Sequence, residues 1–160
     1  RARPDREVER AGRTVRPELQ AIVDEFADYE RELRLELLLE YANALPPLPE
    51  RLLADRGSLE RVQECQTPLY VAVELEDGRV RLFFDAPPEA PTTRGYASVL
   101  AAGLDGASAE EVLATPSDFY VEMKLGELIS PLRLRGMSAL LAMIKRRVER
   151  AAGPTGRGPR

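Results

Sequence analysis

Two short stretches of alternating apolar and polar residues, joined by a tight turn, restrict the fold of this chain most strongly. Every second position from Leu69 to Leu75 carries leucine or valine, which is the pattern of a strand with one apolar face. Residues 76–79 read Glu-Asp-Gly-Arg, and Asp-Gly is typical of a two-residue hairpin turn because both positions tolerate a positive φ. Residues 80–85 provide the partner strand. The sequence therefore predicts an antiparallel β-hairpin over residues 69–85.

Helical periodicity precedes the hairpin. Pro17 suits the first turn of a helix, where its missing N–H costs nothing. A second helix is predicted over residues 30–45, ended by the prolines at 46–49. Residues 50–61 are charged, and a short helix is one option for them. The apolar faces are expected to consist of Leu19, Ile22, Val23 and Phe26 in the first helix and of Leu35, Leu38, Leu39, Ala42 and Leu45 in the second.

Further helices are predicted after the hairpin, the first of them at about residues 93–104. Ser108 and Glu111 stand at capping-box spacing before a short helix, and we expect Pro116 to open another. The last helix begins near Ser130 and Pro131. Its apolar stripe is formed by Met137, Leu140, Leu141, Ile144 and Val148.

This order of elements predicts the α+β class, with a small antiparallel sheet packed on several helices. A length of 160 residues fits one domain, which we assign to residues 17–150. Residues 1–16 contain six arginines without periodicity, and we expect them to form a disordered basic arm. Residues 151–160, rich in glycine and proline, are expected to form a disordered tail.

The charge is unevenly distributed along the chain. Both ends are basic, and the region between them carries a net charge of about −12. A surface of that charge repels phosphate, so we expect no nucleic acid partner. No apolar run approaches the roughly 18 residues that cross a bilayer, so no membrane association is expected. A single cysteine cannot form an internal disulfide, which fits a reducing cytoplasm.

The chain contains no histidine and only one cysteine, Cys65. The missing histidine excludes the Ser–His and Cys–His pairs of nucleophilic enzymes. Zinc and iron–sulfur sites need several cysteines or histidines, and no carboxylate spacing resembles a calcium loop. A carboxylate site for a hard cation is still an open alternative, but we expect neither a metal site nor a cofactor bound by this chain.

Two interpretations of Cys65 are open from the residues alone. A lone cysteine is most often a buried, inert side chain. However, its neighbours Glu64 and Gln66 are polar, and Pro68 favours a strand entry, so we expect Cys65 on a loop, where reactive groups are often presented. Glu64 should raise the pKa of the thiol. Even an unperturbed thiol, with a pKa near 8.5, is only slightly ionised at neutral pH, which suffices to accept sulfur from an activated donor.

Four short segments recur together in a family of known proteins. They are residues 37–52, which end in the proline run; residues 62–71, which surround Cys65; the pair Arg94 and Gly95; and residues 128–146, in which Ser130, Pro131, Arg133 and Gly136 form a Ser-Pro-x-Arg-x-x-Gly run. In this order they resemble the SufE family over about residues 18–148, and the actinobacterial branch in particular. The resemblance implies a SufE/IscU-like fold with Cys65 as a sulfur acceptor.

The chain departs from the better-known form of that family around the cysteine. Glu64 stands where glycine is usual, and Thr67 stands where serine is usual. Residues 84–91 replace an Asp-Ser-Asp segment and keep only Asp85 in approximate register. The change at Glu64 affects the charge and flexibility of the loop, whereas the thiol itself is retained.

The resemblance implies a sulfur carrier that works with a PLP-dependent cysteine desulfurase of the SufS type in iron–sulfur cluster assembly, rather than a stand-alone enzyme. Cys65 would carry the sulfur as a persulfide, flanked by Glu64 and Gln66. Arg133 would stabilise the sulfur anion or bind the partner; the alternative is an ordinary surface or salt-bridge arginine. The PLP belongs to the partner, and an iron–sulfur scaffold is one candidate receiver.

Two other classes of function compete with this expectation. The first is a non-catalytic adaptor of the same fold in which Cys65 is inert, and slow labelling of the folded thiol would favour it. The second is an iron–sulfur scaffold, but one cysteine without histidine cannot supply four ligands. For two residues of the other segments we expect structural roles: Arg94 in the fold, and Gly136 in close packing against another backbone.

Overall fold

The predicted hairpin lies at the centre of the computed structural model, which describes residues 15–153. Strand β2 (Tyr70–Glu76) pairs antiparallel with β3 (Arg79–Asp85). The two turn residues, Asp77 and Gly78, have φ angles of 51° and 77°, as a two-residue turn between twisted strands requires. A third strand, β1 (Glu60–Arg61), pairs antiparallel with β2 and gives the order β1-β2-β3. The predicted α+β class is confirmed.

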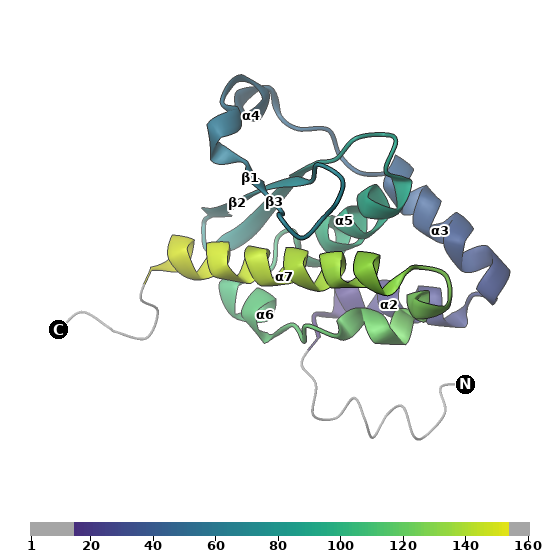
Figure 1. Ribbon diagram of the computed structural model, residues 1–160. Coiled ribbons are helices and arrows are strands. Elements are labelled where there is room, and N and C mark those ends of the chain that lie inside the picture. The colour runs from purple at the N-terminus through teal and green to yellow at the C-terminus, as the bar shows by residue number, and fades with distance from the viewer. Residues whose placement is uncertain (1–14, 154–160) are drawn as a thin grey trace.

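Helices precede and follow this sheet. The elements other than the strands are α2 (Pro17–Asp28), α3 (Arg31–Asn43), α4 (Glu50–Ala54), the 3₁₀ turn η1 (Arg56–Ser58), α5 (Pro91–Leu104), α6 (Ala109–Ala114), the 3₁₀ turns η2 (Phe119–Met123) and η3 (Leu125–Glu127), and α7 (Pro131–Ala152). Helix α7 packs against β2, and α5 packs against α2, α3 and β3. Figure 1 shows α7 running across the molecule in front of the sheet and α5.

The predicted apolar faces of two helices are confirmed. All four residues expected in α2 are buried, as are all five expected in α7. In both helices the large apolar residues recur at spacings of three and four and charged residues occupy the other side, so a single face is identified.

The predicted face of α3 is wrong in part. Leu35 and Leu39 are 42% and 36% exposed, whereas Leu37 is buried. Leucine occupies four of the five positions from 35 to 39, so composition does not fix the rotation of this helix. Packing against α5 fixes it instead. Arg34 takes a buried position because its Nε donates a hydrogen bond of 3.1 Å to the carbonyl oxygen of Phe26.

Three further differences concern the ends of elements. The short helix suggested for the charged stretch at residues 50–61 is present as α4, but the stretch also contains strand β1, which with two residues is too short to show alternation. Pro116 does not open an α-helix; its carbonyl accepts from the Phe119 amide at 3.1 Å, and η2 ends at Lys124 with a φ of 58°. Helix α7 continues to Ala152, past residue 150, the predicted end of the domain.

The boundary at the N-terminal side also differs. Arg16, placed in the basic arm, donates a hydrogen bond of 3.0 Å to the carbonyl oxygen of Asp105 and forms an ion pair with Glu18. It therefore packs on the domain. The remainder of the predicted arm, residues 1–14, and of the predicted tail, residues 154–160, lies outside the described residues.

The predicted capping box of α6 is present and carries a testable contribution to stability. Ser108 Oγ accepts from the Glu111 amide at 3.1 Å, and a Glu111 carboxylate oxygen accepts from the Ser108 amide at 3.0 Å. We expect Ser108→Ala to lower the free energy of unfolding by about 1 kcal/mol, measured by urea denaturation. Ser130→Ala is the control, because that cap accepts a longer bond of 3.4 Å and should contribute less. An equal or larger loss at Ser130 would contradict this ranking.

Candidate functional site

The thiol of Cys65 points inward from a loop, whereas its neighbours Glu64 and Gln66 face solvent. The loop connects β1 to β2 and is closed by a hydrogen bond of 2.8 Å from the Val62 amide to the Leu69 carbonyl oxygen. Within it, the Cys65 amide donates to the Val62 carbonyl oxygen at 3.2 Å. Glu64 and Gln66 are exposed, whereas Cys65 is only 6% exposed. The predicted loop position is confirmed, and the thiol is also part of the core.

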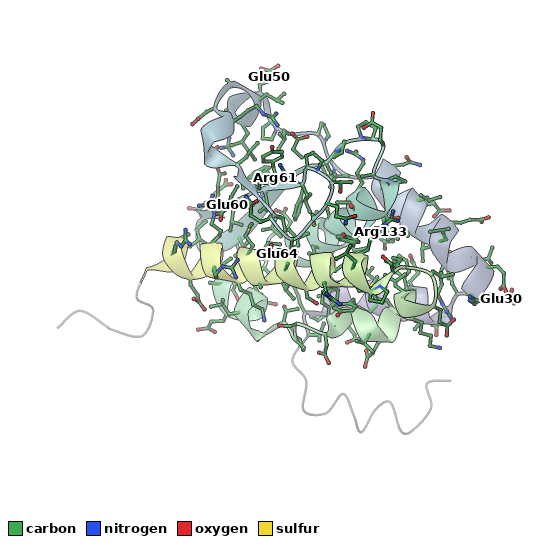
Figure 2. All side chains as sticks on the ribbon, in the orientation of Figure 1. Glu30, Glu50, Glu60, Arg61, Glu64 and Arg133 are labelled. Carbon is green, nitrogen blue, oxygen red and sulfur yellow. The ribbon has the colours of Figure 1, made fainter. Side chains whose placement is uncertain are left out.

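A pocket of about 240 Å³ opens over this thiol. Three segments form it: the cysteine loop at residues 64–67, the start of α5 with the residues before it, and the first turns of α7. Glu64, Cys65, Gln66 and Arg133, the four residues singled out from the sequence, all line it. Figure 2 shows Glu64 and Arg133 on the same side of α7, with Arg133 near the N-terminal end of the helix. The fold therefore brings residues 68 positions apart in the chain into one site.

Arg133 is available to a negatively charged group. It is exposed, and within residues 15–153 its guanidinium forms no hydrogen bond or ion pair. Burial raises the pKa of Tyr96, and the charge of Arg133 opposes that rise. The alternative of a salt-bridge arginine therefore does not hold within the described chain. Among the same residues, no group of three or more histidine, cysteine, aspartate or glutamate side chains could hold a metal ion.

Gly136 makes room for the sulfur rather than for another backbone. A Cβ atom added at Gly136 would lie 3.2 Å from Cys65 Sγ and 3.2 Å from the hydroxyl oxygen of Tyr96. The expectation of close backbone packing is therefore corrected: the atoms that approach this glycine are the thiol and a hydroxyl. The close approach to a backbone occurs at Gly95, where an added Cβ would lie 2.7 Å from the carbonyl oxygen of Leu38 on α3.

Tyr96 and Thr93 are site residues that the sequence did not reveal. Both lie on α5 and are buried, and both line the pocket. The Tyr96 hydroxyl oxygen and Cys65 Sγ each lie 3.2 Å from the position that a Cβ of Gly136 would take. Donation from Tyr96 toward the sulfur, and from Thr93 toward Tyr96, opposes the rise in pKa that burial causes in the accepting group. Thr67, on the cysteine loop, lies 3.1 Å from Thr93, oxygen to oxygen. In the sequence Tyr96 lies in a run of small and apolar residues, which is typical of core, so no signal distinguished it.

Burial is the main influence on the thiol. It raises the pKa of Cys65 above its ordinary value, the hydrogen bond from Tyr96 lowers it, and the charge of Glu64 raises it. The predicted direction of the Glu64 effect is confirmed. Because the net shift is upward, the resting thiol is protonated at neutral pH. Burial, followed by the neighbouring Cys65, raises the pKa of Tyr96 to about 12, so this hydroxyl keeps its proton over the physiological range.

Arg94 has the structural role expected of it. Its Nη1 donates a hydrogen bond of 2.6 Å to the carbonyl oxygen of Ala86, which ties the connector after β3 to the start of α5. Asp85, the remaining residue of the altered segment, pairs with Arg56. These contacts hold the edge of the sheet.

The fold and site define an α+β protein with a single cysteine in a pocket between a loop and two helix starts. A sequence model of the SufE family, described as Fe-S metabolism associated domain, matches residues 20–148. The chain belongs to the SufE family. Its role accordingly lies in iron–sulfur metabolism.

Individual relatives agree with this assignment. An uncharacterised SufE-like protein of Mycobacterium tuberculosis is 56% identical over 134 residues, which are 83% of this chain and 92% of the relative. The chloroplastic SufE-like protein 2 of Arabidopsis thaliana is 34% identical over 68% of this chain and 41% of its own length. A solution structure of a hypothetical protein from Thermus thermophilus matches with a TM-score of 0.78 and 43% identity, over 86% of this chain and 98% of the other.

The helices give no sign of membrane insertion in the part of the chain that the structure covers. Between residues 15 and 153, no helix combines the length and the apolar character that a bilayer span requires.

Proposed function

We propose that this protein accepts sulfur from a PLP-dependent cysteine desulfurase and carries it as a persulfide on Cys65 for iron–sulfur cluster assembly. The observation that supports the proposal is the position of the only cysteine of the chain, at the base of a pocket of about 240 Å³ with Arg133 beside it. Membership of the SufE family supports the link to iron–sulfur metabolism. The PLP is held by the partner, and this chain contributes the accepting sulfur.

The transfer requires no oxidant or reductant. The Cys65 thiolate attacks the terminal sulfur of the persulfide on the desulfurase, and a new S–S bond forms. The S–S bond of the donor breaks, its cysteine leaves as a thiolate, and that thiolate takes up a proton. Cys65 then carries the terminal sulfur as a persulfide, ready for a scaffold of the assembly system. Having one cysteine helps, because no second thiol in the chain can displace the sulfur by closing a disulfide.

Docking of the partner has to expose the sulfur. At 6% exposure, Cys65 does not reach a persulfide that is attached to another protein. Val62 and Leu69 are buried at the two ends of the loop, and Thr67 lies 3.1 Å from Thr93 of α5, oxygen to oxygen. A desulfurase that binds the exposed side chains of Glu64 and Gln66 would widen the pocket over the thiol, so that its persulfide reaches the sulfur beside α5. Exposure also removes the main cause of the raised pKa, so docking and activation of the thiol occur together.

The same burial favours a second function, a non-catalytic adaptor in which Cys65 is a small apolar side chain. Inert cysteines are typically buried and protonated. The two functions differ in one result: an adaptor gains no sulfur from a desulfurase.

Mass spectrometry of the protein after incubation with a cognate desulfurase, PLP-loaded, and free cysteine tests the proposal. We expect the intact mass to increase by one sulfur atom, and we expect peptide mapping to place that sulfur on Cys65. A reductant added afterwards should remove it, because a persulfide is reversible. Omission of free cysteine is the control. Unchanged mass, together with unchanged desulfurase turnover, would favour the adaptor.

A further inference from the structure

Three hydroxyl groups form a chain that ends on the Cys65 sulfur. Thr67 Oγ1 and Thr93 Oγ1 are 3.1 Å apart. The Tyr96 hydroxyl oxygen and Cys65 Sγ each lie 3.2 Å from the position that a Cβ of Gly136 would take. Donation from Thr93 toward Tyr96, and from Tyr96 toward the sulfur, opposes the rise in pKa that burial causes in the accepting group. Because each hydroxyl has one proton to donate, Thr67 completes the chain by donating to Thr93. All three protons then point toward the sulfur, and such chains strengthen one another through polarisation.

The low solvent exposure of these hydroxyl groups strengthens their hydrogen bonding to the sulfur. Tyr96 is 2% exposed and Thr93 is 6% exposed, so water does not compete strongly for their protons. Hydrogen bonds to an ionised acceptor are roughly twice as strong as those between neutral groups. The bond from Tyr96 is therefore worth more when the sulfur is a thiolate or a persulfide anion than when it is a thiol. A donor placed in advance where charge develops is the arrangement that stabilises anionic states in enzymes.

We propose that Tyr96 is a catalytic residue of the sulfur transfer, which donates a hydrogen bond to the Cys65 sulfur as it becomes an anion, and that Thr93 and Thr67 position its hydroxyl. The role in sulfur transfer rests on the proposed function, but the effect of Tyr96 on ionisation of the Cys65 thiol involves residues of this protein alone. The hydrogen bond from Tyr96 performs the activating role that a histidine base has in other thiol enzymes. The chain has no histidine to remove the thiol proton, and it stabilises the deprotonated sulfur instead.

The charged groups around the thiol do not replace this contribution. Glu64 and Glu89 line the pocket and disfavour an anion, whereas Arg133 lines it from α7 and favours one. Arg133 is exposed to solvent, where water screens its charge. The hydroxyl of Tyr96, by contrast, is buried beside the sulfur. The same three charges are present in every hydroxyl variant, so a difference between variants reports the hydroxyl.

The test measures the pH dependence of Cys65 alkylation by iodoacetamide in the full-length protein without desulfurase. We expect Tyr96→Phe to raise the midpoint of the rate profile by about one pH unit, which lowers the thiolate fraction at neutral pH about tenfold. Thr93→Val should raise it less, because Thr93 acts through Tyr96. Tyr120→Phe is the matched control: its hydroxyl accepts from Ser138 at 3.1 Å and does not line the pocket, so its midpoint should equal that of the wild type.

A merely structural role for Tyr96 predicts the opposite sign. If the hydroxyl only holds the loop inward, its removal exposes the thiol, the midpoint falls toward the ordinary value, and the alkylation rate at high pH increases. That result, or an unchanged midpoint in both Tyr96→Phe and Thr93→Val, would overturn the inference. Should Tyr96→Phe not fold, Thr93→Val and Thr67→Val carry the test.

Failure here is distinguishable from failure of the proposed function. The alkylation profile needs no partner, whereas sulfur uptake is measured on the wild type with the desulfurase. If uptake occurs, the uptake rate of Tyr96→Phe should be about tenfold lower at neutral pH and should recover as the pH is raised. If the wild type takes up sulfur but the alkylation midpoint of Tyr96→Phe is unchanged, the proposed function stands and the role of Tyr96 is wrong.

Discussion

Cys65→Ser is expected to lose all sulfur uptake and all stimulation of desulfurase turnover while it still binds the desulfurase. Serine keeps the shape and small size of the side chain but replaces the sulfur nucleophile by a hydroxyl, which is weakly nucleophilic without a base. The chain offers no histidine to act as that base. Binding should persist because Glu64, Gln66 and Arg133 form the surface around the pocket.

Two measurements check this result. Turnover of the desulfurase is followed with wild type and with Cys65→Ser at equal concentrations, and binding is measured by titration. Cys65→Ala serves as the control for the new hydroxyl and should behave in the same way. Stimulation of turnover by either variant would show that the protein acts through docking alone, as an adaptor would. Loss of binding in both variants would instead mean that the substitution disturbs the loop.

Gly95→Ala is expected to destabilise the protein strongly. An added Cβ would lie 2.7 Å from the Leu38 side chain and 2.7 Å from the Leu38 carbonyl oxygen. The side chain can change its rotamer, but the carbonyl belongs to α3, so the two helices must separate. Overpacking of this kind costs roughly 1–3 kcal/mol and sometimes more, whereas alanine in a helix gains only about 1 kcal/mol over glycine. We expect a net loss of about 2 kcal/mol.

Thermal unfolding followed by circular dichroism measures this loss, which should lower the Tm by about 4–8 °C for a chain of this size. Gly126→Ala is the matched control. A Cβ at Gly126 would meet its nearest atom, on Leu134, at 3.8 Å, which is an ordinary contact, so its Tm should stay within about 1 °C of the wild type. Equal Tm values for Gly95→Ala and the wild type would show that α3 and α5 separate without cost.

The parts of the fold that the sequence predicts are those with one unambiguous periodicity. The hairpin, the apolar faces of α2 and α7 and the cap at Ser108 follow from local rules of strand alternation, helix spacing and capping. The rotation of α3 does not, because leucine on several sides leaves the choice to the partner helix. Strand β1 does not either, since its two residues form a strand only through pairing with β2.

The site is predictable to a smaller extent. The polar neighbours of Cys65 indicate a loop, and the segment around Arg133 is recognised by its resemblance to the family. The inward direction of the thiol depends on tertiary packing and has no local signal. Tyr96 lies 31 positions from Cys65 in an apolar helix, where a tyrosine is most simply a core residue. Only the crossing of α5, α7 and the loop identifies it as a neighbour of the sulfur.

Gly95 and Tyr96 are adjacent in α5, and they face different neighbours. Gly95 lets α5 approach Leu38 of α3, and Tyr96 reaches the sulfur. One turn of α5 thus determines both the distance between α3 and α5 and the position of the Tyr96 hydroxyl. Elsewhere in a protein, apolar residues of the core can be exchanged during evolution with little effect on chemistry. Here an exchange on α3 would shift α5 and the Tyr96 hydroxyl, and so change the reactivity of the Cys65 sulfur. The core and the site of this protein are therefore constrained to change together.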